Sequence, residues 1–129
     1  MARATQFSVA LENKPGTLDK LAKVLKKAKV NIEAISVADT VDTGLVRLVA
    51  KPAAKAKKAL SRAKFSVMTQ SVLVVKAPNE PGELASMTAK LAKAKVNINY
   101  VYGTAAGAGS SCTMVLSVNN LAAAERALR

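Results

Sequence analysis

Polar side chains that suit a small zwitterionic ligand recur at two matching places in this chain. Asn13 opens the stretch Asn-Lys-Pro-Gly-Thr-Leu, and Asn79 opens Asn-Glu-Pro-Gly-Glu-Leu. Asn31 and Asn97 follow in two identical Ala-Lys-Val-Asn-Ile stretches. An asparagine amide offers two donors and one acceptor, and the unpaired N–H groups at a helix start attract anions. A pair of asparagines beside a helix start can therefore hold a molecule that carries both a carboxylate and an amine.

The four asparagines also have a purely structural explanation, because asparagine is common at turns and helix boundaries. That explanation would suffice for a single copy. Since the pair recurs in two copies of one unit, binding becomes an equally good explanation. Both stay open at the level of sequence.

Catalytic chemistry has little support in the composition. The chain has no histidine, which removes Ser-His triads and histidine-containing metal sites. Its single cysteine, Cys112, lies in an apolar run and is expected to be a buried, inert thiol. The eight carboxylates show no spacing that is paired in both copies. We therefore expect no catalytic residues, no metal site and no cofactor.

The net charge of +12 raises the question of a polyanionic partner. Most lysines alternate with alanine in segments of helical spacing, which is also typical of a solvated helix surface. We favour the solvated face and keep a nucleic-acid-binding protein as an alternative. No apolar run reaches the roughly 18 residues of a membrane span, and residues 1–6 lack the apolar core of a signal peptide. We expect a soluble, cytoplasmic protein.

The elements that position these residues follow from periodicity. In the first copy, Thr17 is a plausible N-cap, Leu18, Leu21 and Leu25 form an apolar helical stripe, and Asn31 ends the helix. Pro52 suits the first position of a second helix. The expected strands of this copy are 7–11, 32–38, 45–50 and 65–69, with a turn at 39–44.

The second copy repeats this order but stops before its last strand. Its expected strands are 72–75, 98–102 and 112–118, with helices that start near Leu84 and Leu121. The fold class is α+β: two ferredoxin-like βαββαβ units over 1–70 and 71–129, with antiparallel sheets and helices on one face. The short link at Gln70-Ser71 implies units in fixed contact, or one strand running through both. We expect a second copy of the chain to cover the open sheet position.

The order of these motifs resembles that of the ACT domain. Asn-x-Pro-Gly-x-Leu follows a strand, a helix comes next, and Val-Asn-Ile precedes another strand. The stretch from Val37 to Arg47, with Asp39, Asp42 and Gly44, and the stretch Val96–Tyr102 look like those of tandem ACT proteins of prokaryotes. The resemblance covers residues 6–129. It implies a βαββαβ regulatory module that binds amino acids and reports them to metabolic enzymes.

In the serine-sensing ACT domains of phosphoglycerate dehydrogenase, the asparagines of these two motifs contact the ligand at a domain–domain interface. The resemblance therefore implies that an L-amino acid binds at ACT–ACT interfaces of this chain. The candidate ligand-binding residues are Asn13, Lys14, Pro15, Gly16, Asn31, Ile32, Asp39, Arg47, Asn79, Glu80, Pro81, Gly82, Asn97 and Ile98.

Some of these residues have competing explanations. Asp39 and Asp42 suit a turn, and Arg47 is either an exposed strand charge or a bidentate ligand for a carboxylate. The glycine-rich loop at 103–111 leads into a strand rather than a helix, so a hairpin or a lid is a better interpretation than a phosphate site.

The functional hypothesis is a non-catalytic, allosteric amino-acid sensor that forms a homodimer. A regulatory subunit that docks on a metabolic enzyme is the first alternative, because a sensor needs a protein that reads it.

Overall fold

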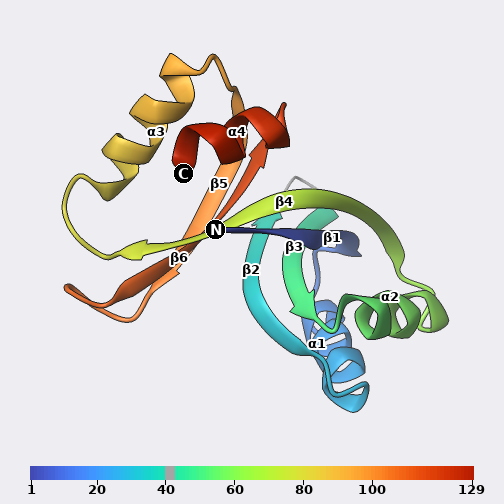
Figure 1. The fold of residues 1–129 in the computed structure, drawn as a ribbon. Helices are drawn as coiled ribbons and strands as arrows, with labels where there is room; N and C mark the ends of the chain where they lie inside the picture. The colour runs from blue at the N-terminus through green and yellow to red at the C-terminus, as the bar shows by residue number, and fades with distance from the viewer. Residues whose placement is uncertain (40–42) are drawn as a thin grey trace. The chain divides into compact units, whose positions relative to one another are not determined.

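The chain forms two compact units, and its first four residues belong to the C-terminal one. The structure is a computed structural model that describes residues 1–39 and 43–129 (Figure 1). The N-terminal unit spans Thr5–Gln70, and the C-terminal unit combines Met1–Ala4 with Ser71–Arg129. Residues 40–42, and with them Asp42 of the expected turn, lie outside the described part.

The N-terminal unit is a sheet with helices α1 and α2 packed against each other (Figure 1). Its elements are β1 (Ala2–Glu12), α1 (Thr17–Lys27), β2 (Asn31–Asp39), β3 (Thr43–Lys51), α2 (Ala53–Arg62) and the first part of β4 (Ser66–Pro78). The strand order is β2-β3-β1-β4, and β3 is antiparallel to both β1 and β2. These are the elements that the sequence predicts for the first copy.

The core of this unit forms where alternate side chains of the central strands meet the helices. Phe7 lies opposite Leu48 in the register, and both are fully buried. Leu21 and Leu25 of α1 complete the core, as their spacing predicts. Leu18 was expected in the same stripe, but it is 42% exposed because it lies on the first helical turn, outside the core cluster.

The C-terminal unit repeats this plan without a final strand after its last helix. It contains the second part of β4, α3 (Glu83–Lys93), β5 (Ile98–Ala105), β6 (Ser111–Val118) and α4 (Leu121–Leu128). The strand order is β4-β6-β5, with antiparallel pairs. Leu73, Leu91 and Leu116 are fully buried at its core. The predicted fold class is confirmed, and β4 is one continuous strand at the expected link.

The N-terminal residues correct the prediction that another chain covers the open sheet position. β1 begins at Ala2 instead of Phe7, and β1 and β4 are neighbours in the strand order. Residues 1–4 group with residues 71–129. The Arg3 guanidinium Nε donates to Glu125 Oε1 of α4 at 2.7 Å. The start of β1 therefore takes the place beside β4 where the sequence pattern left an open position.

Three helices end with the same backbone turn, built on a lysine. Lys29, Lys64 and Lys95 have φ of 59°, 63° and 59°, the left-handed conformation of a helix C-terminal turn. The backbone N–H of the residue after each lysine donates to a carbonyl oxygen in the last turn of the helix. Val30 N–H, for example, donates to Leu25 O at 3.1 Å. Asn31 therefore begins β2 and does not end α1, contrary to expectation.

The starts of two helices also differ from the prediction. Thr17 is the first residue of α1 instead of its N-cap, which is Gly16. Pro52 is the extended N-cap of α2, with ψ of 135°, instead of its first helical residue.

Candidate functional site

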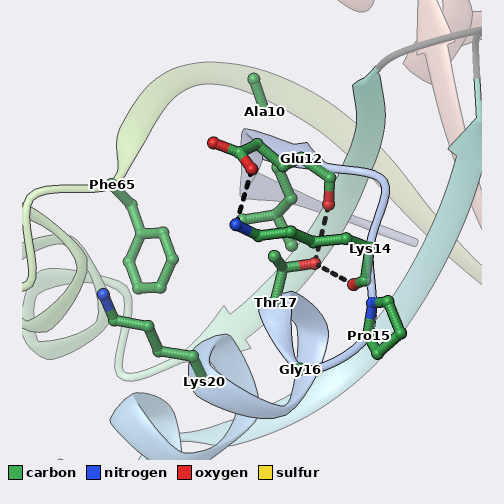
Figure 2. A pocket seen from close by; sticks show the side chains of 9 residues that line it. Ala10, Glu12, Lys14, Pro15, Gly16, Thr17, Lys20 and Phe65 are labelled. Carbon is green, nitrogen blue, oxygen red and sulfur yellow. Dashed lines mark hydrogen bonds and ion pairs between the residues drawn. The ribbon is translucent and has the colours of Figure 1, made fainter.

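An open hollow lies at the start of α1, where the first Asn-x-Pro-Gly motif leads into the helix (Figure 2). Its volume is about 460 Å³. We call it the α1 hollow. It is lined by Ala10, Leu11, Glu12, Lys14, Pro15, Gly16, Thr17, Lys20 and Phe65. Three of the predicted site residues, Lys14, Pro15 and Gly16, are thus brought together in one concave site.

The loop that forms the wall of this hollow is held by the Thr17 side chain. Thr17 Oγ1 lies 2.8 Å from the carbonyl oxygen of Glu12 and 3.1 Å from that of Lys14 (Figure 2). The backbone N–H of Lys14 also donates to Glu12 O at 3.0 Å. The hydroxyl binds backwards to the loop, which explains why it does not cap the helix.

Opposite charges pair on the loop that lines the hollow. Lys14 Nζ lies 2.8 Å from Glu12 Oε2 (Figure 2). The hydrogen bond from Lys14 lowers the pKa of Glu12, and the same hydrogen bond raises the pKa of Lys14. Lys20 Nζ lies 5.6 Å from the centre of the Phe65 ring, within the range of a cation–π contact. The hollow thus presents two ammonium groups, one carboxylate and one aromatic face.

Both repeated motifs leave a helix start uncapped. Gly16 and Gly82 are the N-cap residues of α1 and α3, with φ of 92° and 89°, a conformation that glycine adopts without strain. Within the described residues no side chain caps either helix. In contrast, Asn120 Oδ1 accepts from Ala123 N–H at the start of α4. The first N–H groups of α1 thus remain available to an anion, whereas the first N–H of α3, that of Glu83, donates to Glu80 O at 3.3 Å.

The structure does not bring the two asparagines of one copy together. Asn13 is exposed and does not line the α1 hollow. Asn31 is exposed at the start of β2, beyond the other end of α1. An 11-residue helix is about 16 Å long, so one small ligand cannot touch both asparagines within a unit. Asn79 and Asn97 are separated in the same way by α3.

Asn79 has a partner that its counterpart Asn13 lacks in the described residues. Its Nδ2 donates to Gly107 O at 2.8 Å, and its N–H donates to Ser110 O at 2.6 Å. Gly109 N–H in turn donates to Asn79 O at 3.1 Å. Three hydrogen bonds therefore bind the glycine-rich loop to the second motif.

Asn97 also belongs to a polar network. Its N–H donates to Asn119 Oδ1 at 2.9 Å, and Asn119 N–H donates back to Asn97 O at 3.1 Å. Asn97 Nδ2 donates to Asn99 Oδ1 at 3.1 Å. These bonds join the start of β5 to the end of β6, so Asn97 has a structural role in the C-terminal unit.

The remaining candidates are spread over both units. Ile32 and Ile98 pack against the two cores. Asp39 is exposed at the end of β2, opposite Gly44. Arg47 lies opposite Ser8, is half-buried and interacts with another residue. Because Leu48 faces the core, the alternation of the strand puts Arg47 on the other face of the sheet. Glu80, Pro81 and Gly82 are exposed at the start of α3.

Sequence reasoning missed six residues that line the α1 hollow, namely Ala10, Leu11, Glu12, Thr17, Lys20 and Phe65. Thr17 lies within the motif, and Glu12 and Lys20 lie within two residues of it, so a search that included every polar residue of the motif and its flanks would have found them. Phe65 enters from the end of α2, and no local signal connects it to residue 16.

The comparisons with known proteins agree with this architecture. A family profile described as the ACT domain pair matches residues 2–128. The chain belongs to this family. The resemblance inferred from the motifs is therefore confirmed over almost the whole ACT pair.

Solved structures share the same fold. Protein BT0572 from Bacteroides thetaiotaomicron is 32% identical, with a TM-score of 0.90 and coverage of 98% of this chain and 86% of that one. The regulatory subunit of aspartate kinase from Thermus thermophilus, in its ligand-free form, is 17% identical, with a TM-score of 0.71 and coverage of 99% and 91%. The subunit from Thermus flavus is 18% identical, with a TM-score of 0.67 and coverage of 98% and 90%. No curated protein sequence matches the chain.

Two further observations concern the described residues of the ACT pair. They contain no group of three or more His, Cys, Asp or Glu side chains placed to hold a metal ion. None of their helices has the length and apolar character needed to cross a membrane.

Proposed function

We propose that this ACT pair is a non-catalytic regulatory protein that binds an L-amino acid at the start of α1. The observation that carries the proposal is the α1 hollow, where an uncapped helix start lies beside two lysines and one carboxylate. An α-carboxylate would accept hydrogen bonds from the first N–H groups of α1 and pair with Lys14 or Lys20. An α-ammonium would pair with Glu12.

The first copy suits this role better than the second. In the second copy Glu80 stands where Lys14 stands in the first, which places a negative charge where the ligand carboxylate would bind. Asn79 is engaged with the glycine-rich loop, whereas the amide of Asn13 is exposed. A ligand at the first copy therefore meets a cation in place of a carboxylate, and the Asn13 amide beside the hollow is not engaged with a loop of the described residues.

A second copy of the chain would complete the site. The α1 hollow is open, and ligand sites in proteins usually bury most of the ligand surface. Exposed apolar side chains border the same end of the unit, namely Leu18 on α1 and Val37 on β2. We propose that a homodimer contact covers them, and that Asn31 of one chain reaches the ligand held by the other.

The test is thermal unfolding with a panel of the twenty L-amino acids, followed by calorimetric titration of any that stabilise. A ligand at one hundred times its Kd adds about 2.7 kcal/mol, or about 10 °C for a chain of this size. Lys14→Ala should abolish the shift, and Glu80→Ala at the matching position should keep it. Binding that survives in an Asn13→Ala, Asn79→Ala double variant would exclude the asparagines as ligand contacts.

A regulatory subunit that docks on a metabolic enzyme is the second candidate. Its support is the fold, which this chain shares with structures named as regulatory subunits of aspartate kinase. A flat amino-acid panel together with a stable complex with a metabolic kinase would favour this candidate over the sensor.

A further inference from the structure

Positive charge is concentrated on the helices of the N-terminal unit. Of the 20 lysines and arginines in the chain, 13 lie in residues 5–70, together with 5 of the 8 acidic residues. Residues 17–29 and 51–64 alone hold 11 cations and one carboxylate, Asp19. Asp19 is paired with Lys23 at 2.8 Å. The excess charge of this helical face is therefore not neutralised by its own acidic residues.

The second copy shows that these lysines are not needed to form the fold. When Asn13 is aligned with Asn79, three lysines of α1 correspond to small, uncharged residues of α3. The pairs are Lys20 with Ser86, Lys23 with Ala89 and Lys26 with Ala92. Since α3 has the same length as α1, helix formation does not explain these three lysines, whereas Lys27 has a counterpart in Lys93 of α3.

An open groove runs between α1 and α2 on this face. Its volume is about 440 Å³, and it is lined by Val24, Lys27, Ala28, Ala59, Arg62 and Ala63. The valine and the three alanines are half-buried, so a floor of small apolar side chains remains accessible. Lys27 and Arg62 are exposed on its rims, and no carboxylate of the described residues pairs with either. We call this feature the α1–α2 groove.

We propose that the α1–α2 groove docks an acidic amphipathic helix of a partner protein. The small side chains of the floor let a third helix approach closely, and its apolar residues at i, i+3 and i+4 would pack on Val24 and Ala59. Its carboxylates on both flanks would pair with Lys27 and Arg62. Charge complementarity thus defines the occupant as acidic, and the apolar floor defines it as amphipathic.

A nucleic acid fits this surface less well. A phosphate backbone gains nothing from an apolar floor, and single strands are held by stacking on aromatic side chains. The groove has no aromatic lining residue. The proposal is also separate from the amino-acid site, because the groove lies along the second half of α1 and the α1 hollow at its start.

The test uses the full chain and a fluorescein-labelled helical peptide of 20 residues, with leucine at i, i+3, i+4 and i+7 and glutamate on the flanks. Anisotropy titration should show saturable binding of this peptide. A peptide of identical composition but scrambled order should bind at least tenfold more weakly. Lys27→Glu with Arg62→Glu should weaken binding at least tenfold. The matched variant Lys93→Glu with Arg126→Glu makes the same change of charge in the C-terminal unit, and it should weaken binding less than threefold.

Each other outcome overturns the proposal. Equal losses in the two double variants would mean attraction to net charge without a docking site. Equally tight binding of the scrambled peptide would show that the apolar floor does not contribute to the interaction. Tighter binding of a single-stranded oligonucleotide of the same charge would assign the face to nucleic acid. Circular dichroism melts confirm that both variants fold, and an amino-acid titration of Lys27→Glu with Arg62→Glu shows whether the ligand site is intact.

Discussion

Replacing Asn79 with alanine tests most directly whether the asparagines of the two motif copies have different structural roles. The substitution removes the hydrogen bond from Nδ2 to Gly107 O, at 2.8 Å, and leaves the two backbone bonds between Asn79 and the loop in place. A hydrogen bond of this kind contributes about 0.5–1.5 kcal/mol net. We expect a loss near 1 kcal/mol, which lowers the melting temperature by about 4 °C for 129 residues.

Asn13→Ala is the control, because the Asn13 amide makes no hydrogen bond within the described residues. It should change the free energy of unfolding by less than about 0.5 kcal/mol. Thermal melts measure the global effect. Hydrogen exchange measures the local one: the Gly109 and Ser110 amides should exchange about fivefold faster in Asn79→Ala and unchanged in Asn13→Ala.

Equal destabilisation by the two substitutions would refute this reasoning, since it would show that Asn13 has a structural role of the same weight. Unchanged exchange at Gly109 in Asn79→Ala would show that the backbone bonds alone hold the loop. In that case the Asn79 amide would be as available to a ligand as that of Asn13, and the preference for the first copy would rest on Lys14 alone.

Four other predictions follow from the fold and the site. The Glu12–Lys14 pair lowers the pKa of Glu12 below 4.5 and raises that of Lys14 above 10.5. The pair therefore contributes its full stability between these two pH values. That contribution is lost as pH falls through the folded pKa of Glu12, and it is also lost as pH rises through the folded pKa of Lys14. An NMR titration should show a higher Glu12 pKa in Lys14→Ala, and an unchanged pKa would contradict the pairing. Lys64→Gly relieves the positive φ and should raise the free energy of unfolding by about 0.5–1 kcal/mol in urea denaturation, where a decrease would show that the lysine is not strained. Deletion of residues 1–4 should speed hydrogen exchange in residues 71–78, and unchanged protection there would mean that the N-terminus is not part of that unit. Leu91→Ala, at a fully buried site, should cost about 2–5 kcal/mol by thermal or chemical denaturation, and a loss under 1 kcal/mol would mean that the core of this unit is loosely packed.

Much of the fold was accessible from the sequence, because its signals are local. Alternation predicts the strand around Phe7, and a 3.6-residue period predicts the helix that buries Leu21 and Leu25. The repeat of the Asn-x-Pro-Gly motif predicts two units, whereas the N-cap expected at Thr17 is wrong, because Gly16 takes that position without a side-chain cap. Each of these features depends on residues that lie within one or two turns of each other.

The candidate site was only partly accessible. The loop residues Lys14, Pro15 and Gly16 were found because the motif repeats, and they do line the α1 hollow. Phe65 was missed because it reaches that hollow from the far end of the unit. Asn13 and Asn31 are separated by the length of α1, so they could contact one ligand only if the two asparagines came from different chains. A single unit does not contain that contact.

The sequence by itself determined the elements, the repeat and the family, since these depend on the order and spacing of neighbouring residues. Only the tertiary structure decided that residues 1–4 join the unit at the other end of the chain, that Asn79 binds the glycine-rich loop and that cations border a groove between α1 and α2. The physical reason is that hydrogen bonds, ion pairs and packing depend on distance in space. Chain order restricts that distance for near neighbours, and only the closure of the fold determines it for residues far apart.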